Sequence, residues 1–172
     1  MKLIRNAALF VASSLFSINM MAQTKQDIVD VAAGSAAHTT LVAAVKAAGL
    51  VETLKSKGPF TVFAPTNDAF AKLPAGTVDN LLKPESKSAL AGILTYHVVA
   101  GNLSAKNVLS AIKKGDGKVV LTTVAGGKLT AAIENGIVVL TDENGGKAIV
   151  TATDLKATNG VIHVIDAVLL PK

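Results

Sequence analysis

"NGVIHVIDAVLLPK", residues 159–172, is an almost unbroken apolar run that carries two residue types common in active sites, His163 and Asp166. A strand that is apolar on both faces is normally buried on both sides. Alternate side chains of a strand point to opposite faces, so these two residues are not expected to form a catalytic pair. Each then needs a hydrogen-bond partner from another element, since a buried unpaired polar group costs about 1–3 kcal/mol. We therefore interpret both as structural residues of a buried strand.

Short strands joined by tight turns precede this stretch. Residues 118–155 divide into β-branched runs separated by Gly126-Gly127, Asn135-Gly136 and Asn144-Gly145-Gly146. Asn-Gly and Gly-Gly pairs supply the positive φ angles that tight hairpins need. Gly-Gly-Lys occurs in two of these turns, where it indicates a hairpin and not a phosphate-binding loop. The second half of the chain is therefore predicted to be rich in antiparallel strands.

The first half of the chain has the spacing of helices. Apolar residues recur at helical spacing over residues 41–48, and Gly49 follows them as a stop signal. Further helices are predicted over residues 88–96 and 105–112, the second preceded by a serine that can cap it. Residues 60–64 form an isolated strand candidate within this helical half. Together the two halves predict a single α+β domain.

A polar corner follows the isolated strand. Pro65 ends the strand, and Thr66, Asn67 and Asp68 come directly after it. Side chains of these types cap helices by accepting hydrogen bonds from backbone N–H groups, and they can also bind a cation. We favour the capping role. The pair Tyr96-His97 lies among apolar neighbours. A histidine in such a setting is more often a core residue than a metal ligand.

Most standard catalytic and cofactor signatures are missing from the sequence. It has no Gly-x-Ser-x-Gly elbow, no phosphate loop ending in Gly-Lys-Ser/Thr and no His-x-x-x-His pair. The three histidines are far apart in the sequence, and the chain has no cysteine, which excludes thiol chemistry and thiolate metal sites. We therefore expect no catalytic residues, no metal and no cofactor.

The N-terminus has the pattern of a secretory signal peptide. Lys2 and Arg5 precede the apolar residues 7–18, and Ala22 is a small residue at a suitable cleavage position. The apolar stretch is shorter than the roughly 20 residues that span a bilayer. We predict that residues 1–22 are the signal peptide, with cleavage after Ala22; the alternative is an uncleaved N-terminal anchor. The mature protein is then expected to be secreted or periplasmic, with no transmembrane anchor.

The charge of the chain limits its partners. Without Lys2 and Arg5, the 17 basic residues become 15 against 12 acidic ones, a net charge of +3. The lysines are scattered, and the sequence has one tyrosine and no tryptophan. This pattern gives little support to nucleic-acid binding and leaves only a mild attraction to acidic surface polymers.

Three blocks of the sequence together resemble the fasciclin-type (FAS1) domain. They are FTVFAPTNDAF at residues 60–70, the pair Tyr96-His97, and ATNGVIHVIDAVLLP at residues 157–171. Their order and spacing fit one complete domain over residues 27–172. The resemblance implies an α+β fold in which two β-sheets form a wedge with several helices packed alongside.

The resemblance also implies a function and a set of residues. Fasciclin domains act in adhesion or matrix interaction, without catalysis or a cofactor. Their conserved structural polar network corresponds here to Thr66, Asn67, Asp68, His163 and Asp166. Partner binding in animal members corresponds to Tyr96 and His97, and to Asp154 and Leu155, where the leucine replaces the family's isoleucine.

Two functional hypotheses follow. The first is a secreted domain that mediates cell adhesion or surface interaction by binding a protein or polysaccharide, as expected for small secreted bacterial members of the family; self-association is also compatible with it. The second is a small-molecule-binding or metal-binding envelope protein that uses His97 or Asp68.

Overall fold

The computed structural model describes residues 25–172, so the expected signal peptide, residues 1–22, lies outside the described residues. The helices are α1 (Ile28–Ala33), α2 (Thr39–Ala48), α3 (Val51–Lys55), α4 (Asn67–Ala71), α5 (Thr77–Leu81), α6 (Lys87–Tyr96) and α7 (Ala105–Lys114), with short 3-10 turns η1 (Ala36–His38) and η2 (Pro84–Ser86). The strands are β1 (Phe60–Pro65), β2 (Val98–Ala100), β3 (Lys118–Thr122), β4 (Lys128–Glu134), β5 (Ile137–Thr141), β6 (Lys147–Ala157) and β7 (Gly160–Ile165).

The strands form one mixed sheet in the order β2-β1-β7-β6-β5-β4-β3. Only β1 and β7 pair in parallel; every other neighbouring pair is antiparallel. The long strand β6 pairs with β7 through one part and with β5 through another, and its pairing with β7 shifts register twice between Val150 and Leu155. Such bulges bend a strand, so β6 serves two sheet halves set at an angle. The predicted α+β wedge is confirmed.

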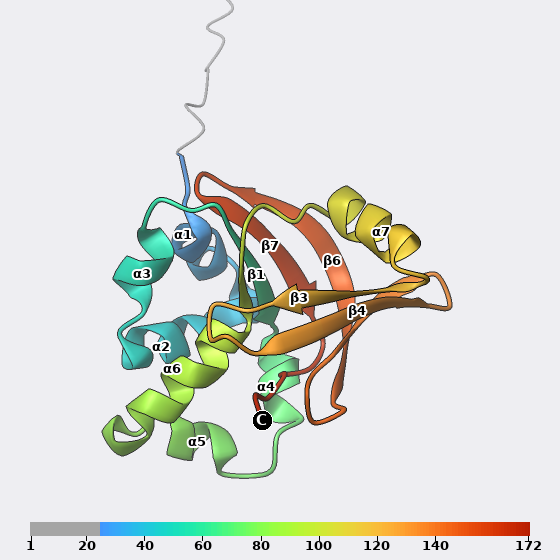
Figure 1. Ribbon diagram of the computed structural model, residues 1–172. Helices are drawn as coiled ribbons and strands as arrows, with labels where there is room; N and C mark the ends of the chain where they lie inside the picture. Colours follow the sequence, from blue (N-terminus) through green and yellow to red (C-terminus); the bar gives the residue numbers. More distant parts are fainter. Residues whose placement is uncertain (1–24) are drawn as a thin grey trace, which may run out of the picture.

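The two ends of the sheet come together and nearly close it. A single bridge joins Val99, in β2, to Thr123, just after β3. The N–H of Val124 also donates to the carbonyl of Val98 at 2.7 Å. Helix α7 packs against β3 and β4, with Val108 and Ile112 buried. The remaining helices gather on the other side of the molecule (Figure 1).

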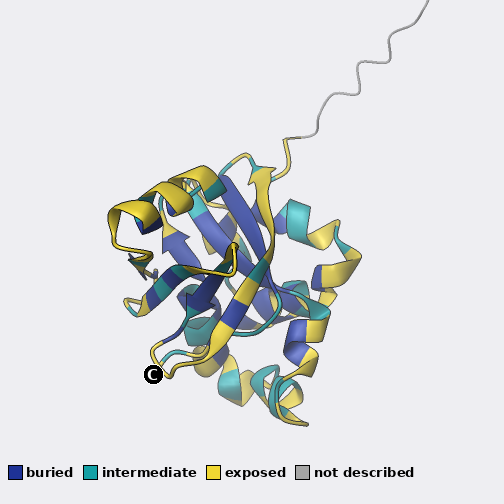
Figure 2. Ribbon diagram, turned by 90° about the vertical axis from the view of Figure 1, so that its right-hand side faces the viewer, coloured by how far each residue is buried: buried dark blue, intermediate teal, exposed yellow. Residues whose placement is uncertain are grey.

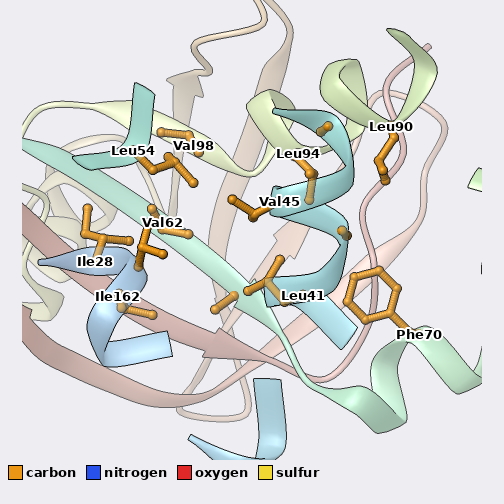
Figure 3. Close-up of a cluster of buried hydrophobic side chains, with 14 residues drawn as sticks. Ile28, Leu41, Val45, Leu54, Val62, Phe70, Leu90, Leu94, Val98 and Ile162 are labelled. Atoms are coloured by element: carbon orange, nitrogen blue, oxygen red, sulfur yellow. The ribbon is translucent and has the colours of Figure 1, made fainter. Parts of the chain in front are cut away.

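Two groups of buried apolar side chains stabilise this arrangement. One lies between the helices and the β1–β7 part of the sheet, and Figure 3 shows its side chains converging from α1, α2, α6 and the strands. The second lies inside the curved sheet and includes Tyr96, Ile112, Leu129, Leu140 and Ile165. Strand β7 is buried along its whole length, as predicted for a strand that is apolar on both faces. Figure 2 shows the buried strands enclosed by helices and turns with exposed outer faces.

The local signals in the sequence produce the expected turns and caps. Gly49 ends α2 in the left-handed conformation, with φ of 71°. Asn135 and Gly136 have φ of 52° and 80° in the turn between β4 and β5, as an Asn-Gly hairpin requires. Ser104 caps α7 by accepting a hydrogen bond from the N–H of Asn107. The helices predicted over residues 88–96 and 105–112 are present as α6 and α7, and α7 extends two residues beyond its predicted range.

The last strand is shorter than the apolar run suggested. Strand β7 ends at Ile165, and Asp166 lies beyond it in the C-terminal segment, residues 166–172, which has no regular structure. None of the described helices is long and apolar enough to cross a membrane.

Candidate functional site

His163 lies in a buried chain of hydrogen bonds beneath the loop between β2 and α7. Its Nε2 lies 2.6 Å from the carbonyl oxygen of Leu103, which can only accept, so Nε2 carries the proton. Its Nδ1 then accepts a hydrogen bond from the N–H of Asp154 at 3.4 Å. The ring is also stacked on Phe63, with the centroids 5.6 Å apart. Both nitrogens are therefore engaged by the backbone, and neither faces solvent.

Thr61, on β1, continues the same chain of hydrogen bonds. Its hydroxyl donates to the carbonyl of Gly101 and accepts from the N–H of Leu103, both at 2.8 Å. Thr61 is completely buried. The β2–α7 loop is thus fixed to the sheet by one side chain from each of the neighbouring strands β1 and β7. Nothing in the sequence around Thr61 marks it for this role, because its partners lie 40 and 42 positions away.

Asp154 and Leu155 lie at the bend of β6. Asp154 adopts the left-handed conformation, with φ of 59°, and its Oδ1 accepts a hydrogen bond from the N–H of Ala105 at 2.8 Å. This contact satisfies a donor in the first turn of α7. Leu155 projects at the surface with 38% of its area exposed. Of the two residues, Asp154 fixes the start of α7 and Leu155 is exposed at the surface.

Asp166 is held by a different set of contacts from those of His163. Its Oδ1 accepts from the N–H of Ile149 at 2.7 Å, and its Oδ2 pairs with the Lys72 ammonium at 3.2 Å. Partial burial by itself would raise the pKa of this carboxyl, but the Ile149 N–H and the Lys72 ammonium outweigh burial and lower it below 3.8. Asp166 therefore connects β6 to α4 as a carboxylate and makes no contact with His163.

The polar corner after β1 organises two helices. Thr66 caps α4 by accepting from the N–H of Ala69 at 3.2 Å. Asn67 reaches the start of α2, where its Oδ1 accepts from the N–H of Thr40 at 3.0 Å and its Nδ2 donates to the carbonyl of Ala36 at 2.9 Å. Asp68 is exposed in the first turn of α4. Within residues 25–172, no three His, Cys, Asp or Glu side chains come close enough to hold a metal ion.

Tyr96 is completely buried at the end of α6. Its hydroxyl donates to the carbonyl of Lys128 at 2.7 Å and accepts from the N–H of Glu143 at 3.2 Å. Burial raises the pKa of the phenol above 10.0. A single side chain therefore ties α6 to both the start of β4 and the β5–β6 turn.

His97 holds the C-terminal segment in place. Its Nδ1 contacts the carbonyl of Ile93 at 2.8 Å and so carries the proton, while Nε2 accepts from the N–H of Leu169 at 3.0 Å. Burial lowers the pKa of this imidazole to about 4. With both nitrogens engaged, His97 offers no free lone pair to a metal ion. The resemblance singled out four residues for partner contact. Tyr96 and His97 are buried, and Asp154 is engaged by Ala105. Of the four, only Leu155 has a side chain that is exposed and makes no hydrogen bond.

Two further residues hold the C-terminal segment, residues 166–172, and the sequence did not predict them. Asp142 accepts from the N–H groups of Asn144, Gly146 and Leu170 at 2.9, 2.7 and 3.0 Å. Asn144 donates to the carbonyls of Leu170 and Pro171 at 3.0 and 3.1 Å. The Asp-Glu-Asn-Gly-Gly sequence contains a usable signal, because aspartate before such a turn commonly bonds the backbone two residues on.

A polar groove of about 530 Å³ opens at the end of the molecule where α3 meets the sheet. Its walls are the α3–β1 connection, the turn between β6 and β7, and Asn102 from the β2–α7 loop. These segments are far apart in the sequence and lie together at one end of the fold (Figure 1). This groove was not predicted, because it depends on how the three loops assemble.

Comparison with known proteins places these features in a family. The sequence model of the Fasciclin domain matches residues 36–171. The chain is 56% identical to protein sll1483 of Synechocystis over 144 residues, covering 84% of this chain and 73% of that protein. It is 38% identical over 159 residues to transforming growth factor-beta-induced protein ig-h3 of Sus scrofa, covering 92% of this chain and 21% of ig-h3.

A solved structure shares the fold. The FAS1 domain pair from the insect cell adhesion molecule Fasciclin I superimposes with a TM-score of 0.73 at 22% identity, covering 84% of this chain and 51% of that one. At this level of identity the likeness concerns the fold alone.

Proposed function

The chain belongs to the fasciclin domain family, and on this premise we propose that it is an exported, non-catalytic domain that mediates adhesion to a protein or polysaccharide of a cell surface or matrix. We propose further that residues 27–172 form its single domain. In support, one protein that shares the fold is a cell adhesion molecule.

One observation carries the non-catalytic part of the proposal. His97, His163 and Asp166, three polar residues of types used in catalysis, are engaged in tying backbone segments together. His163 binds the Leu103 carbonyl, His97 binds Ile93 and Leu169, and Asp166 binds Ile149. General acid–base catalysis needs a side chain within hydrogen-bond reach of a substrate, and these groups already have protein partners. Partner binding is therefore assigned to the exterior of the domain, where side chains such as Leu155 are accessible.

The proposal of export rests on the N-terminal sequence pattern. It is tested by expressing the full chain in its source cell and separating cytoplasm, envelope and medium. We expect the protein in the envelope or medium, with its N-terminus at Gln23 by mass spectrometry. A full-length protein that stays in the cytoplasm would contradict the proposal.

The proposed adhesive function is tested by capture. Mature protein is immobilised and exposed to solubilised envelope and matrix fractions, and bound proteins and sugars are identified by mass spectrometry. The control is the His97→Gln variant immobilised above its unfolding temperature, because a specific partner requires the folded domain. We expect one protein or polysaccharide to be retained by the folded protein only. Equal retention on both surfaces, or on neither, would contradict an adhesive role.

A further inference from the structure

We propose that the polar groove, formed by residues 55–59, Asn102 and residues 157–160, binds a short segment of an acidic polysaccharide. Lys57 is assigned to pair with a carboxylate or sulfate group of the sugar chain. This inference rests on the proposed function and deepens it, because it names the class of partner and the place where it binds. The groove volume of about 530 Å³ lies in the range of roughly 300–1,000 Å³ that is usual for small-ligand sites.

The floor of the groove is held rigidly by Asn159. Its Nδ2 donates to the carbonyls of Leu54 and Ser56 at 2.6 and 3.0 Å, and its Oδ1 accepts from the N–H of Ile28 at 3.0 Å. Its own carbonyl accepts from the N–H of Phe60 at 3.0 Å. One asparagine thus connects α1, α3, β1 and the β6–β7 turn.

Two glycines bring the walls of the groove close together. A Cβ atom at Gly58 would collide with the Asn159 carbonyl, and one at Gly160 would collide with the Phe60 carbonyl. The N–H of Gly101 donates to the carbonyl of Pro59 at 2.9 Å and holds the third wall. A site whose walls are fixed in advance loses little conformational entropy when it binds a ligand. The groove is therefore preorganised.

Three side chains on the walls have hydrogen-bonding groups without a partner in the described part of the chain. They are the Lys57 ammonium, the Asn102 amide and the Thr158 hydroxyl, for which residues 25–172 provide no side-chain hydrogen bond. All three residues are exposed. Together they supply one positive charge, one amide and one hydroxyl, which matches the carboxylate and hydroxyl groups of a uronic acid.

Lys57 supplies the unpaired positive charge that would meet an anion in the groove. The neighbouring Lys55 is already paired with Asp27 and Asp30, each at 3.0 Å, so this cluster keeps one net negative charge and Lys55 is not available to a ligand. Lys57 forms no ion pair with any residue from 25 to 172 and remains available. Charge-assisted hydrogen bonds of this kind are roughly twice as strong as neutral ones.

The lining of the groove favours a sugar chain over an acidic peptide. Peptide recognition commonly uses apolar or aromatic pockets, an open strand edge, or a cluster of arginines for acidic motifs. Among the residues that line the groove there is no large aliphatic or aromatic side chain, and the groups present are lysine, serine, asparagine, threonine, glycine, proline and alanine. A hydroxyl-rich ligand finds partners along such a surface, whereas a peptide side chain finds no apolar pocket.

The test uses trigalacturonate, a short uronic-acid chain, titrated into the mature isotope-labelled protein and followed by two-dimensional NMR. We expect shifts confined to the groove residues, with binding that weakens as salt is added. Lys57→Gln is expected to weaken binding about tenfold or more, and Thr158→Val several-fold. The matched control, Lys118→Gln, removes an exposed lysine beyond the far end of α7 and should leave binding unchanged. Shifts outside the groove in the wild-type protein, or equal effects of both lysine variants, would overturn the assignment.

Two further probes test the ligand class. The methyl ester of trigalacturonate keeps the hydroxyls and removes the charges, so we expect it to bind more weakly. A short polyglutamate peptide that binds as tightly as trigalacturonate would overturn the choice of a polysaccharide. If trigalacturonate fails to bind although the folded domain captures an envelope partner, the groove assignment is wrong and the adhesive function stands. If it binds in the groove but nothing is captured from cells or matrix, the adhesive function is wrong and the groove assignment stands.

Discussion

The N–H of Leu169 donates a hydrogen bond to Nε2 of His97 at 3.0 Å, across 72 positions of the chain. The contact requires a neutral imidazole, because a protonated ring has no acceptor nitrogen. This contact between the fold and its C-terminal segment, one of several, therefore depends on the charge of a buried histidine.

Acid should destabilise the protein through His97. Its pKa is lowered from 6.5 to about 4 in the folded state, so folding disfavours the proton. The contribution of His97 is complete above pH 6.5 and is lost as the pH falls toward 4, a loss of roughly 3 kcal/mol in the free energy of unfolding. Burial lowers the pKa of His38 as well, which adds a loss of the same sign. The measurement is urea unfolding across this pH range. His97→Gln, which does not titrate, should show a shallower pH dependence, and an unchanged slope would contradict the prediction.

Removing the His163 imidazole should lower stability. His163→Ala leaves the Leu103 carbonyl and the Asp154 N–H without partners and opens a space beside Phe63. We expect a loss of about 2–4 kcal/mol in the free energy of unfolding, measured by denaturant and thermal unfolding. Partner binding should change only as far as folding is lost. A variant of normal stability that no longer binds would show that His163 acts in binding instead.

The bend of β6 can be tested at Asp154. Asp154→Ala removes the hydrogen bond to Ala105 and places alanine in the left-handed region, so we expect a loss of about 1–3 kcal/mol. Asp154→Gly removes the same hydrogen bond but tolerates this conformation, so its loss should be smaller. Equal losses in the two variants, measured by urea unfolding, would show that backbone conformation contributes nothing at this site.

Leu155 should separate binding from stability. The side chain is 38% exposed, so Leu155→Ser is expected to change the free energy of unfolding by less than about 1 kcal/mol. If this surface contacts the partner, retention in the capture experiment should fall severalfold. The exposed Leu109, on α7, provides a control as Leu109→Ser. Unchanged retention of the Leu155 variant would remove this residue from the proposed contact surface.

Two glycine substitutions should act in opposite directions. Gly92 lies within α6, and a Cβ there meets no atom within 4 Å, so Gly92→Ala should stabilise the protein by about 0.5–1 kcal/mol. A Cβ at Gly127 would lie 2.5 Å from the ring of Tyr96, so Gly127→Ala should cost about 1–3 kcal/mol. Thermal unfolding of both variants checks the pair. A tolerated Gly127→Ala would show that Tyr96 can move without loss of its hydrogen bonds.

The sequence was most informative where structure depends on neighbouring residues. Asn135-Gly136 forms a hairpin and Gly49 ends a helix because each acts through its own backbone conformation. Strand β2, only three residues long, escaped prediction because it is fixed by pairing with β1 and not by its own pattern. The short helices α3 and α5 carry too few turns to leave a periodic signal, whereas α4 could be predicted from the polar corner that caps it.

The candidate site was harder to predict for the same reason. The resemblance associates Tyr96 and His97 with partner binding, whereas their partners in the fold are turns and a segment 32 to 72 positions away. The contribution of Asp154 depends on a bend in β6 that a regular strand pattern does not reveal. Capping by Thr66 could be predicted because its partner lies three residues on. The distance in sequence between a side chain and its partner sets the limit in each case.

The near-closure of the sheet has a consequence for the behaviour of the protein at high concentration. A seven-stranded open sheet would expose two edges whose unpaired backbone groups can recruit strands from other molecules. Here the two terminal strands meet at the Val99–Thr123 bridge, and α7 packs against β3. The bridge and the helix reduce the unpaired backbone at these edges that could template aggregation when the protein is concentrated.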